Sequence, residues 1–153
     1  MEKSLKNTAM DTVFERPVPQ PDGISAGFWK SAADGRLSIS QCTQCRTFHH
    51  PPRALCRECG GSGFQYQPVS GKGRIWSWTT THRSVITNFD QVLPYTCIVV
   101  ELEEQAGLFL VSDLVGRELG AELKVGLPVS VFFAPLGEKG KVLPQFKLDQ
   151  DRE

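Results

Sequence analysis

The chain has 153 residues, enough for one mid-sized domain or two small domains that share a core. Basic and acidic residues number 17 each, so no net field draws the chain to nucleic acid or to an anionic membrane. Apolar residues make up 40%, as in an ordinary globular domain, and no apolar run approaches the length of a membrane span. The polar first residues lack a secretory signal pattern, so we expect a cytoplasmic protein with reduced thiols.

The chain begins with a predicted tail and one short helix. Residues 1–21 form an extended tail, because three prolines at alternate positions favour a polyproline-like backbone. Residues 22–36 hold the N-terminal helix, with Asp22 or Ser25 as its cap and Gly35 at its end. The apolar positions at helical spacing are Ile24, Phe28, Trp29 and Ala32. So short a helix is unstable alone in water, so its aromatic face must dock on the chain's own core or on a partner protein.

Four of the five cysteines form two Cys-x-x-Cys pairs, which predict a zinc ribbon over residues 37–66. Each pair lets the backbone turn so that both sulfurs point at one ion, and two pairs make a tetrahedral four-sulfur site. The ligands are Cys42, Cys45, Cys56 and Cys59. Since all four positions are filled, the zinc is predicted to be structural. Two disulfides are the alternative, but a secreted chain would normally carry a signal.

A stiff connection joins the two cysteine pairs. It carries Phe48, His49, His50 and Arg53, and its Pro51–Pro52 pair excludes a helix or a central strand. We expect both histidines to stay off the metal, because four cysteines already complete its shell.

Residues 67–149 are predicted to form a five-stranded OB-fold barrel, which makes the whole chain mainly β. The expected strands cover residues 74–83, 94–102, 108–114, 129–133 and 142–148. In the first strand, Trp76 and Trp78 share a face with Thr80 and His82 by alternation, and both tryptophans are expected to pack against the ribbon or helix.

Several motifs occur together in one order, and their combination resembles a known family. They are Phe28-Trp29 with Gly35-Arg36-Leu37, the two cysteine pairs, Phe48 with Pro51-Pro52-Arg53, Gly71-x-Gly73, Pro94-Tyr95 and the sequence 125–129. The match covers roughly residues 24 to 148. The family joins a rubredoxin-like zinc ribbon to an OB-fold and accompanies acyl-CoA enzymes.

The resemblance implies a non-catalytic accessory subunit in a hetero-oligomer with a thiolase-fold enzyme. Members of the family typically partner thiolases, acyltransferases and side-chain aldolases that act on CoA thioesters. The large partner carries the nucleophilic cysteine, while the small subunit completes the assembly and helps to hold the acyl-CoA. Phe28, Trp29, Pro51 and Pro52 are the candidates for the partner interface.

The phosphates of CoA require arginine or lysine, and the pantetheine arm requires a narrow apolar slot. The candidates for this site near the expected ribbon–barrel junction are Phe48, Arg53, Lys72, Arg74 and Arg83. Arg53 is the first choice, because the proline pair before it restricts its direction.

Two other functions remain open. Trp76 and Trp78 on an OB-fold could stack bases of single-stranded nucleic acid, although the neutral charge argues against it. A stand-alone enzyme would need a nucleophile, but the remaining cysteine, Cys97, has no acid–base neighbour in sequence and is expected to be a small buried residue.

Overall fold

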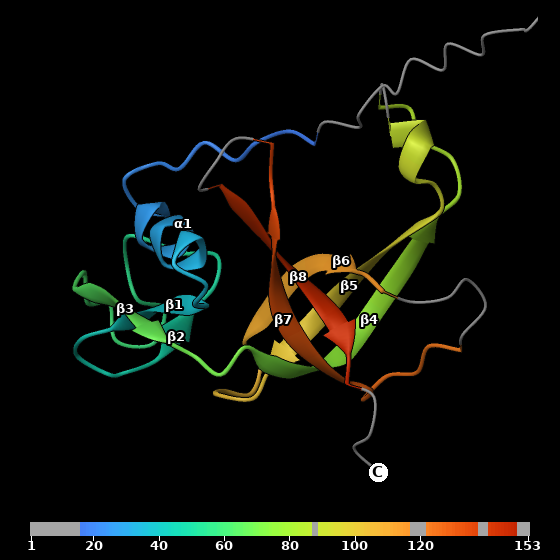
Figure 1. Ribbon diagram of the computed structural model, residues 1–153. Helices are drawn as coiled ribbons and strands as arrows, with labels where there is room; N and C mark the ends of the chain where they lie inside the picture. Colours follow the sequence, from blue (N-terminus) through green and yellow to red (C-terminus); the bar gives the residue numbers. More distant parts are fainter. Residues whose placement is uncertain (1–15, 87–88, 117–121, 138–140, 150–153) are drawn as a thin grey trace, which may run out of the picture.

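The computed structural model describes residues 16–86, 89–116, 122–137 and 141–149 (Figure 1). Within these ranges a helix, α1 (Ala26–Ala33), precedes a three-stranded ribbon of β1 (Ser38–Cys42), β2 (Phe48–His49) and β3 (Phe64–Pro68). A closed barrel follows, with strands β4 (Lys72–Thr81), β5 (Tyr95–Leu102), β6 (Phe109–Leu114), β7 (Pro128–Pro135) and β8 (Val142–Leu148). A 3-10 helix, η1 (Phe89–Val92), lies in the connection between β4 and β5. None of the described helices is long and apolar enough to cross a bilayer.

The barrel has the strand order β4-β5-β6-β8-β7 and closes where β7 pairs with β4. Four of its pairings are antiparallel, and β6 and β8 run parallel. Side chains at alternate positions fill its interior, where Ile98, Val129 and Phe146 are fully buried. The predicted mainly β architecture of helix, zinc ribbon and five-stranded OB-fold barrel is therefore confirmed.

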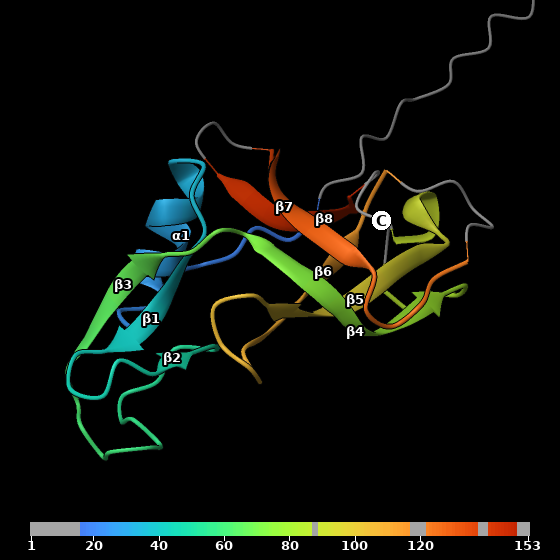
Figure 2. The ribbon, with the colours of Figure 1, turned by 90° about the horizontal axis from the view of Figure 1, so that it is seen from below.

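The ribbon and α1 lie beside one end of the barrel and share its core (Figures 1 and 2). Phe28 of α1 and Leu37 and Ile39 of the ribbon belong to the same buried cluster as the barrel residues. The Val69 amide donates to the Leu37 carbonyl at 2.9 Å, where the chain leaves the ribbon for the barrel. One continuous apolar core therefore fixes the ribbon against the barrel.

A side-chain clamp also joins the two parts. Gln105, in the turn between β5 and β6, accepts from the Phe48 amide at 2.8 Å and donates to the Phe48 carbonyl at 3.1 Å. The Gln105 side chain thus satisfies both the N–H and the carbonyl of Phe48, which lies on an edge strand of the ribbon, as a neighbouring strand would. Nearby, a carboxylate oxygen of Glu104 accepts from the Ser70 amide at 2.6 Å. The β5–β6 turn therefore holds both the ribbon edge and the start of the barrel.

The helix ends at a glycine as predicted, but it begins later than predicted, after Ser25, which makes no side-chain cap hydrogen bond to the first turn. Asp22 and Ser25 bond each other's backbone amides with their side chains, at 2.7 and 3.1 Å. Gly35, with φ of +74°, ends the helix in the left-handed conformation that glycine adopts without strain. One predicted position is wrong, because Ile24 precedes the first helical residue and is 48% exposed.

The tail is described only from Arg16 onward, and residues 16–21 have no regular secondary structure. Arg16 forms an ion pair with Asp113 on β6, so this part of the tail is tied to the barrel. The expectation for residues 1–15 lies outside the described residues.

The expected positions of the two tryptophans on β4 are wrong. Two residues of β4 oppose one of β5 between Ile75 and Ser77, so a β-bulge at Trp76 breaks the alternation of side chains. Trp76 is 53% exposed and its ring lies 5.1 Å from that of Phe109, while Trp78 pairs with Ile98 and is 38% exposed. The tryptophans therefore share no face, and neither is buried against the ribbon or helix.

The closure of the barrel makes a prediction about Gly73, which pairs with β5 on one side and β7 on the other. A Cβ atom there would overlap the Glu101 carbonyl oxygen and a methyl group of Val100. Gly73→Ala is expected to lower the free energy of unfolding by about 1–3 kcal/mol, because backbone cannot move aside as a flexible side chain can. Urea denaturation of the variant and the unmodified protein measures this difference in the free energy of unfolding. Gly23→Ala is the matched control, since a Cβ at Gly23 meets no atom within 4 Å, and an equal loss in both variants would contradict the prediction.

Candidate metal centre

The sulfur atoms of the four predicted ligands, Cys42, Cys45, Cys56 and Cys59, converge on one point. They all lie within 4.8 Å of one another. The Sγ atoms of Cys42 and Cys59 are 3.6 Å apart, and those of Cys45 and Cys56 are 3.5 Å apart. A zinc ion with four sulfurs at its usual bond length would place neighbouring sulfurs roughly 3.8 Å apart. All five cysteines are free thiols, so the alternative of two disulfides is not what the structure contains.

Two equivalent turns aim the sulfurs at this point. The carbonyl of Cys42 accepts from the Arg46 amide, and the carbonyl of Cys56 accepts from the Gly60 amide, both at 3.0 Å. The two donors have left-handed φ values of 66° and 73°. The turns therefore match in backbone conformation, although one uses arginine where the other uses glycine, the residue that adopts this conformation freely.

The close approach of the four thiols makes their pKa values differ. The hydroxyl and amide of Thr47 lower the pKa of Cys45 to about 6. The Gly61 amide lowers the pKa of Cys59, but burial and the other sulfurs outweigh it and raise that pKa to about 12. A divalent cation removes the conflict, because it stabilises the thiolate at every position. Zinc fits this donor set, and with four sulfur ligands it would keep no open position for substrate.

The loop between the cysteine pairs projects its two histidines to opposite sides. His49, on β2, is buried beside the sulfur cage, with its Nε2 atom 3.2 Å from the Cys56 sulfur. His50 points away and its ring lies 5.4 Å from that of Phe28. Pro51 is exposed, and Pro52 and Arg53 are half-buried. Leu55, which the sequence did not single out, is 61% exposed at the same loop.

The structure separates the predicted CoA-binding residues. Phe48 and Lys72 lie at the ribbon–barrel junction, since the β5–β6 turn bonds the backbone of both. Arg53 lies near His49 in the ribbon loop, since its charge contributes, after the larger effect of burial, to lowering the pKa of His49.

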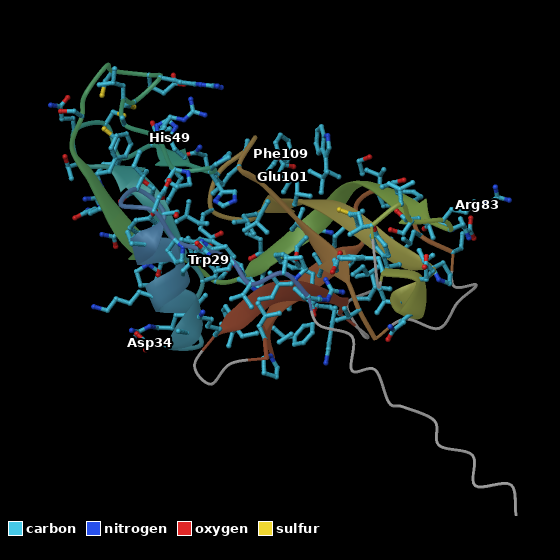
Figure 3. All side chains as sticks on the ribbon, turned by 90° about the horizontal axis from the view of Figure 1, so that it is seen from above. Trp29, Asp34, His49, Arg83, Glu101 and Phe109 are labelled. Atoms are coloured by element: carbon cyan, nitrogen blue, oxygen red, sulfur yellow. The ribbon has the colours of Figure 1, made fainter. Side chains whose placement is uncertain are left out.

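Arg74 and Arg83 are placed differently. The Arg74 guanidinium donates to the Gly126 carbonyl at 3.0 Å. Arg83 follows the far end of β4, well away from His49 (Figure 3). The ten residues of β4 separate it from the junction by about 30 Å. The expectation that Arg83 lies near the junction is therefore wrong.

A cavity that sequence reasoning missed lies between α1, the ribbon loop and the barrel. It has a volume of about 320 Å³ and is lined by Phe28, Trp29, His50, Leu110, Ser112 and Asp113, among others. Arg16 also lines the cavity and forms an ion pair with Asp113. The Asp113 carboxylate accepts a second hydrogen bond, from the side-chain amide of Gln145 at 3.2 Å. No short-range motif marks this cavity, because its walls come from distant segments of the chain.

The remaining thiol, Cys97, has no activated character. It lies on β5 and is partly rather than fully buried. Burial raises its pKa, and the charge of Asp113 raises it further, so the thiol form is favoured at neutral pH.

Two models of protein families match the chain in tandem. The rubredoxin-like zinc ribbon domain of ChsH2 matches residues 29–65, and the C-terminal OB-fold domain of ChsH2 matches residues 66–134. A DUF35 domain-containing scaffold protein of Methanothermobacter thermautotrophicus is 32% identical over 69% of this chain and 77% of that protein. A probable enoyl-CoA hydratase alpha subunit of Thermomonospora curvata is 32% identical over 83% of this chain, which spans 38% of that protein's length.

Solved structures agree with these matches. One described as an Ltp2-ChsH2(DUF35) aldolase has a TM-score of 0.74 and 29% identity, over 85% of this chain and 98% of that chain. A DUF35 protein of unknown function from Sulfolobus solfataricus shares the fold, with a TM-score of 0.52 and 16% identity over 80% of this chain and 82% of that one.

Removal of one ligand tests the metal site. Cys42→Ser is expected to abolish stoichiometric zinc and unfold the ribbon, because the metal supplies the free energy that holds so small a unit together. Elemental analysis and hydrogen exchange of residues 38–68 measure this. Cys97→Ser is the control, since it removes a thiol that does not belong to the cage. A Cys42→Ser variant that kept its zinc and the protection of its ribbon amides would contradict a structural role.

Proposed function

We propose that this chain, which belongs to the DUF35 family of proteins joining a ChsH2-type zinc ribbon to an OB-fold, is a non-catalytic accessory subunit of a thiolase-like enzyme complex. In this role it stabilises the complex and helps to bind or orient an acyl-CoA, while the partner carries out the chemistry. The zinc is structural, and its thiolate ligands fit a reducing, cytoplasmic setting.

The observation that carries this proposal is the match to the Ltp2-ChsH2(DUF35) aldolase. The match covers 98% of a chain from a structure whose description names two components, so a hetero-oligomer is the natural proposal here. Side-chain chemistry supports the division of labour. The cage thiols have a ligand role, and burial disfavours the thiolate of Cys97.

The loop between the cysteine pairs supplies the proposed partner surface. Pro51, Pro52 and Leu55 form a stiff, partly apolar projection beside the zinc cage. Trp29 is half-buried and retains accessible surface. Phe28 is only 8% exposed and packs in the chain's own core, so it supports this surface from beneath rather than touching a partner.

For the acyl-CoA, we propose that Phe48, Arg53 and Lys72 contribute at the junction. The Arg53 Nε atom is buried and has no hydrogen-bond partner among the described residues. An unpaired buried donor is costly, so a small movement of the Arg53 side chain that lets a ligand phosphate or a carbonyl of the partner reach this atom would be favourable. Arg74 is a weaker candidate because its guanidinium already bonds a carbonyl, and Arg83 lies too far away.

The alternative of single-stranded nucleic-acid binding has one specific observation in its favour. The rings of exposed Trp76 and half-buried Phe109 lie 5.1 Å apart at a tilted angle, and Val111 is 63% exposed. An accessible aromatic surface of this kind on an OB-fold suits stacked bases. It suits a protein partner equally, and the chain's zero net charge does not supply the attraction that phosphates require.

Purification of the chain from its native source tests the main proposal. A thiolase-like subunit is expected to co-elute at constant ratio, and turnover of a CoA thioester should require both chains. Turnover by the purified small chain would instead establish a stand-alone enzyme. Tight oligonucleotide binding without a partner, falling steeply with salt and lost in Trp76→Ala, would establish the nucleic-acid alternative.

Substitution of one arginine tests the CoA contact in the assembled complex. Arg53→Ala is expected to weaken acyl-CoA binding by about tenfold to a hundredfold, the usual effect of losing a charge-assisted hydrogen bond. Arg83→Ala should leave binding unchanged and serves as the control. Calorimetry with CoA and with dephospho-CoA shows whether the lost contact is to the 3′-phosphate. Equal affinities of Arg53→Ala and the unmodified complex would exclude Arg53 from the CoA site.

A further inference from the structure

His49 lies beside the sulfur cage without belonging to it. It is 8% exposed on β2, where it pairs with Ser40 of β1. Its Nε2 atom lies 3.2 Å from the Cys56 sulfur, and its ring meets the edge of the Phe64 ring at 5.7 Å. Two strands and an aromatic contact therefore hold the imidazole in one orientation, with a nitrogen directed at a metal ligand.

The other three sulfurs have hydrogen-bond donors of their own. The amides of Cys45 and Gln44 face the Cys42 sulfur, the Thr47 hydroxyl lies 3.3 Å from the Cys45 sulfur, and the Gly61 amide faces the Cys59 sulfur. Four thiolates around a dication leave a net charge of −2, which such donors stabilise. Cys56 is 4% exposed, so water has little access to its sulfur.

We propose that His49 is a positioning residue of the zinc centre, whose neutral imidazole donates its Nε2 hydrogen to the zinc-bound thiolate of Cys56. A metal-bound thiolate is an acceptor, so the nitrogen that faces it must carry the hydrogen. The bond gives the buried Cys56 sulfur a side-chain donor, holds Cys56 in place and slows loss of the metal. This inference rests on zinc occupying the cage, and the metal content of the unmodified protein checks that premise separately.

His50 shows that the arrangement is specific to one of two adjacent histidines. Its ring contacts Phe28 and lines the cavity against the barrel, on the other side of the loop from the sulfurs. Successive residues of an extended chain point to opposite sides, so only one of the two can reach the cage. The expectation that both histidines stay off the metal is compatible with this role, because His49 contacts a ligand sulfur rather than adding a fifth ligand.

The test compares zinc release from the full chain and two variants. His49→Phe keeps a planar ring but removes the donor, and it is expected to release zinc to a chromogenic chelator about tenfold to a hundredfold faster. His49→Gln, which retains an N–H donor, should recover part of the difference. His82→Phe, at an exposed histidine beyond the end of β4, is the control and should release zinc at the unmodified rate.

Two spectroscopic measurements complete the test. In the cobalt-substituted protein, His49→Phe should shift the sulfur-to-metal charge-transfer bands while the tetrahedral d–d bands persist. Unchanged release and unchanged bands would mean that His49 only packs against the cage, and loss of the tetrahedral bands would make it a ligand; either result overturns the proposal. If His49→Phe does not fold, nitrogen NMR of the unmodified cadmium-substituted protein decides. A hydrogen on Nε2 coupled to the metal is expected, and a hydrogen on Nδ1 alone would overturn the proposal.

Discussion

The convergence of four sulfur atoms on one point is the constraint on which the ribbon depends. Its strands have five, two and five residues, and sheets so small are barely stable in water without a further link. A tetrahedral metal ion bound there would join the ends of these strands and fix the loop between the two cysteine pairs. Its role would be to hold Pro51, Pro52 and Arg53 in a defined position, since four sulfur ligands leave no open coordination site.

The position of that loop relative to the barrel depends on contacts that the metal does not make. Leu37 and Ile39 extend the apolar core of the barrel into the ribbon, and Gln105 closes the edge of β2 like a short additional strand. These contacts explain how a zinc ribbon and an OB-fold present one surface. They also explain why the residues proposed to meet CoA come from both parts of the chain, with Arg53 on one side of the junction and Lys72 on the other.

The sequence-based predictions succeeded where the signal is local. The cysteine spacing, the glycine that ends α1 and the alternating strands each reflect geometry within a few residues. They failed for Trp76, because a single-residue bulge reverses the side to which a strand's side chains point. They failed for Arg83, because closeness in sequence to Lys72 becomes a large separation along an extended strand. The candidate site was thus predictable in its ligands but not in its surroundings.

The sequence by itself determined the fold class, the family and the four metal ligands, since each of these is written in short spacings and in the order of motifs. Only the tertiary structure decided which distant groups meet. Gln105 reaches Phe48 across 57 positions, and Arg16 reaches Asp113 across 97. It also decided that His49, and not His50, faces the Cys56 sulfur. Such pairings depend on the packing of the ribbon against the barrel and on strand register, which form only when the whole core assembles.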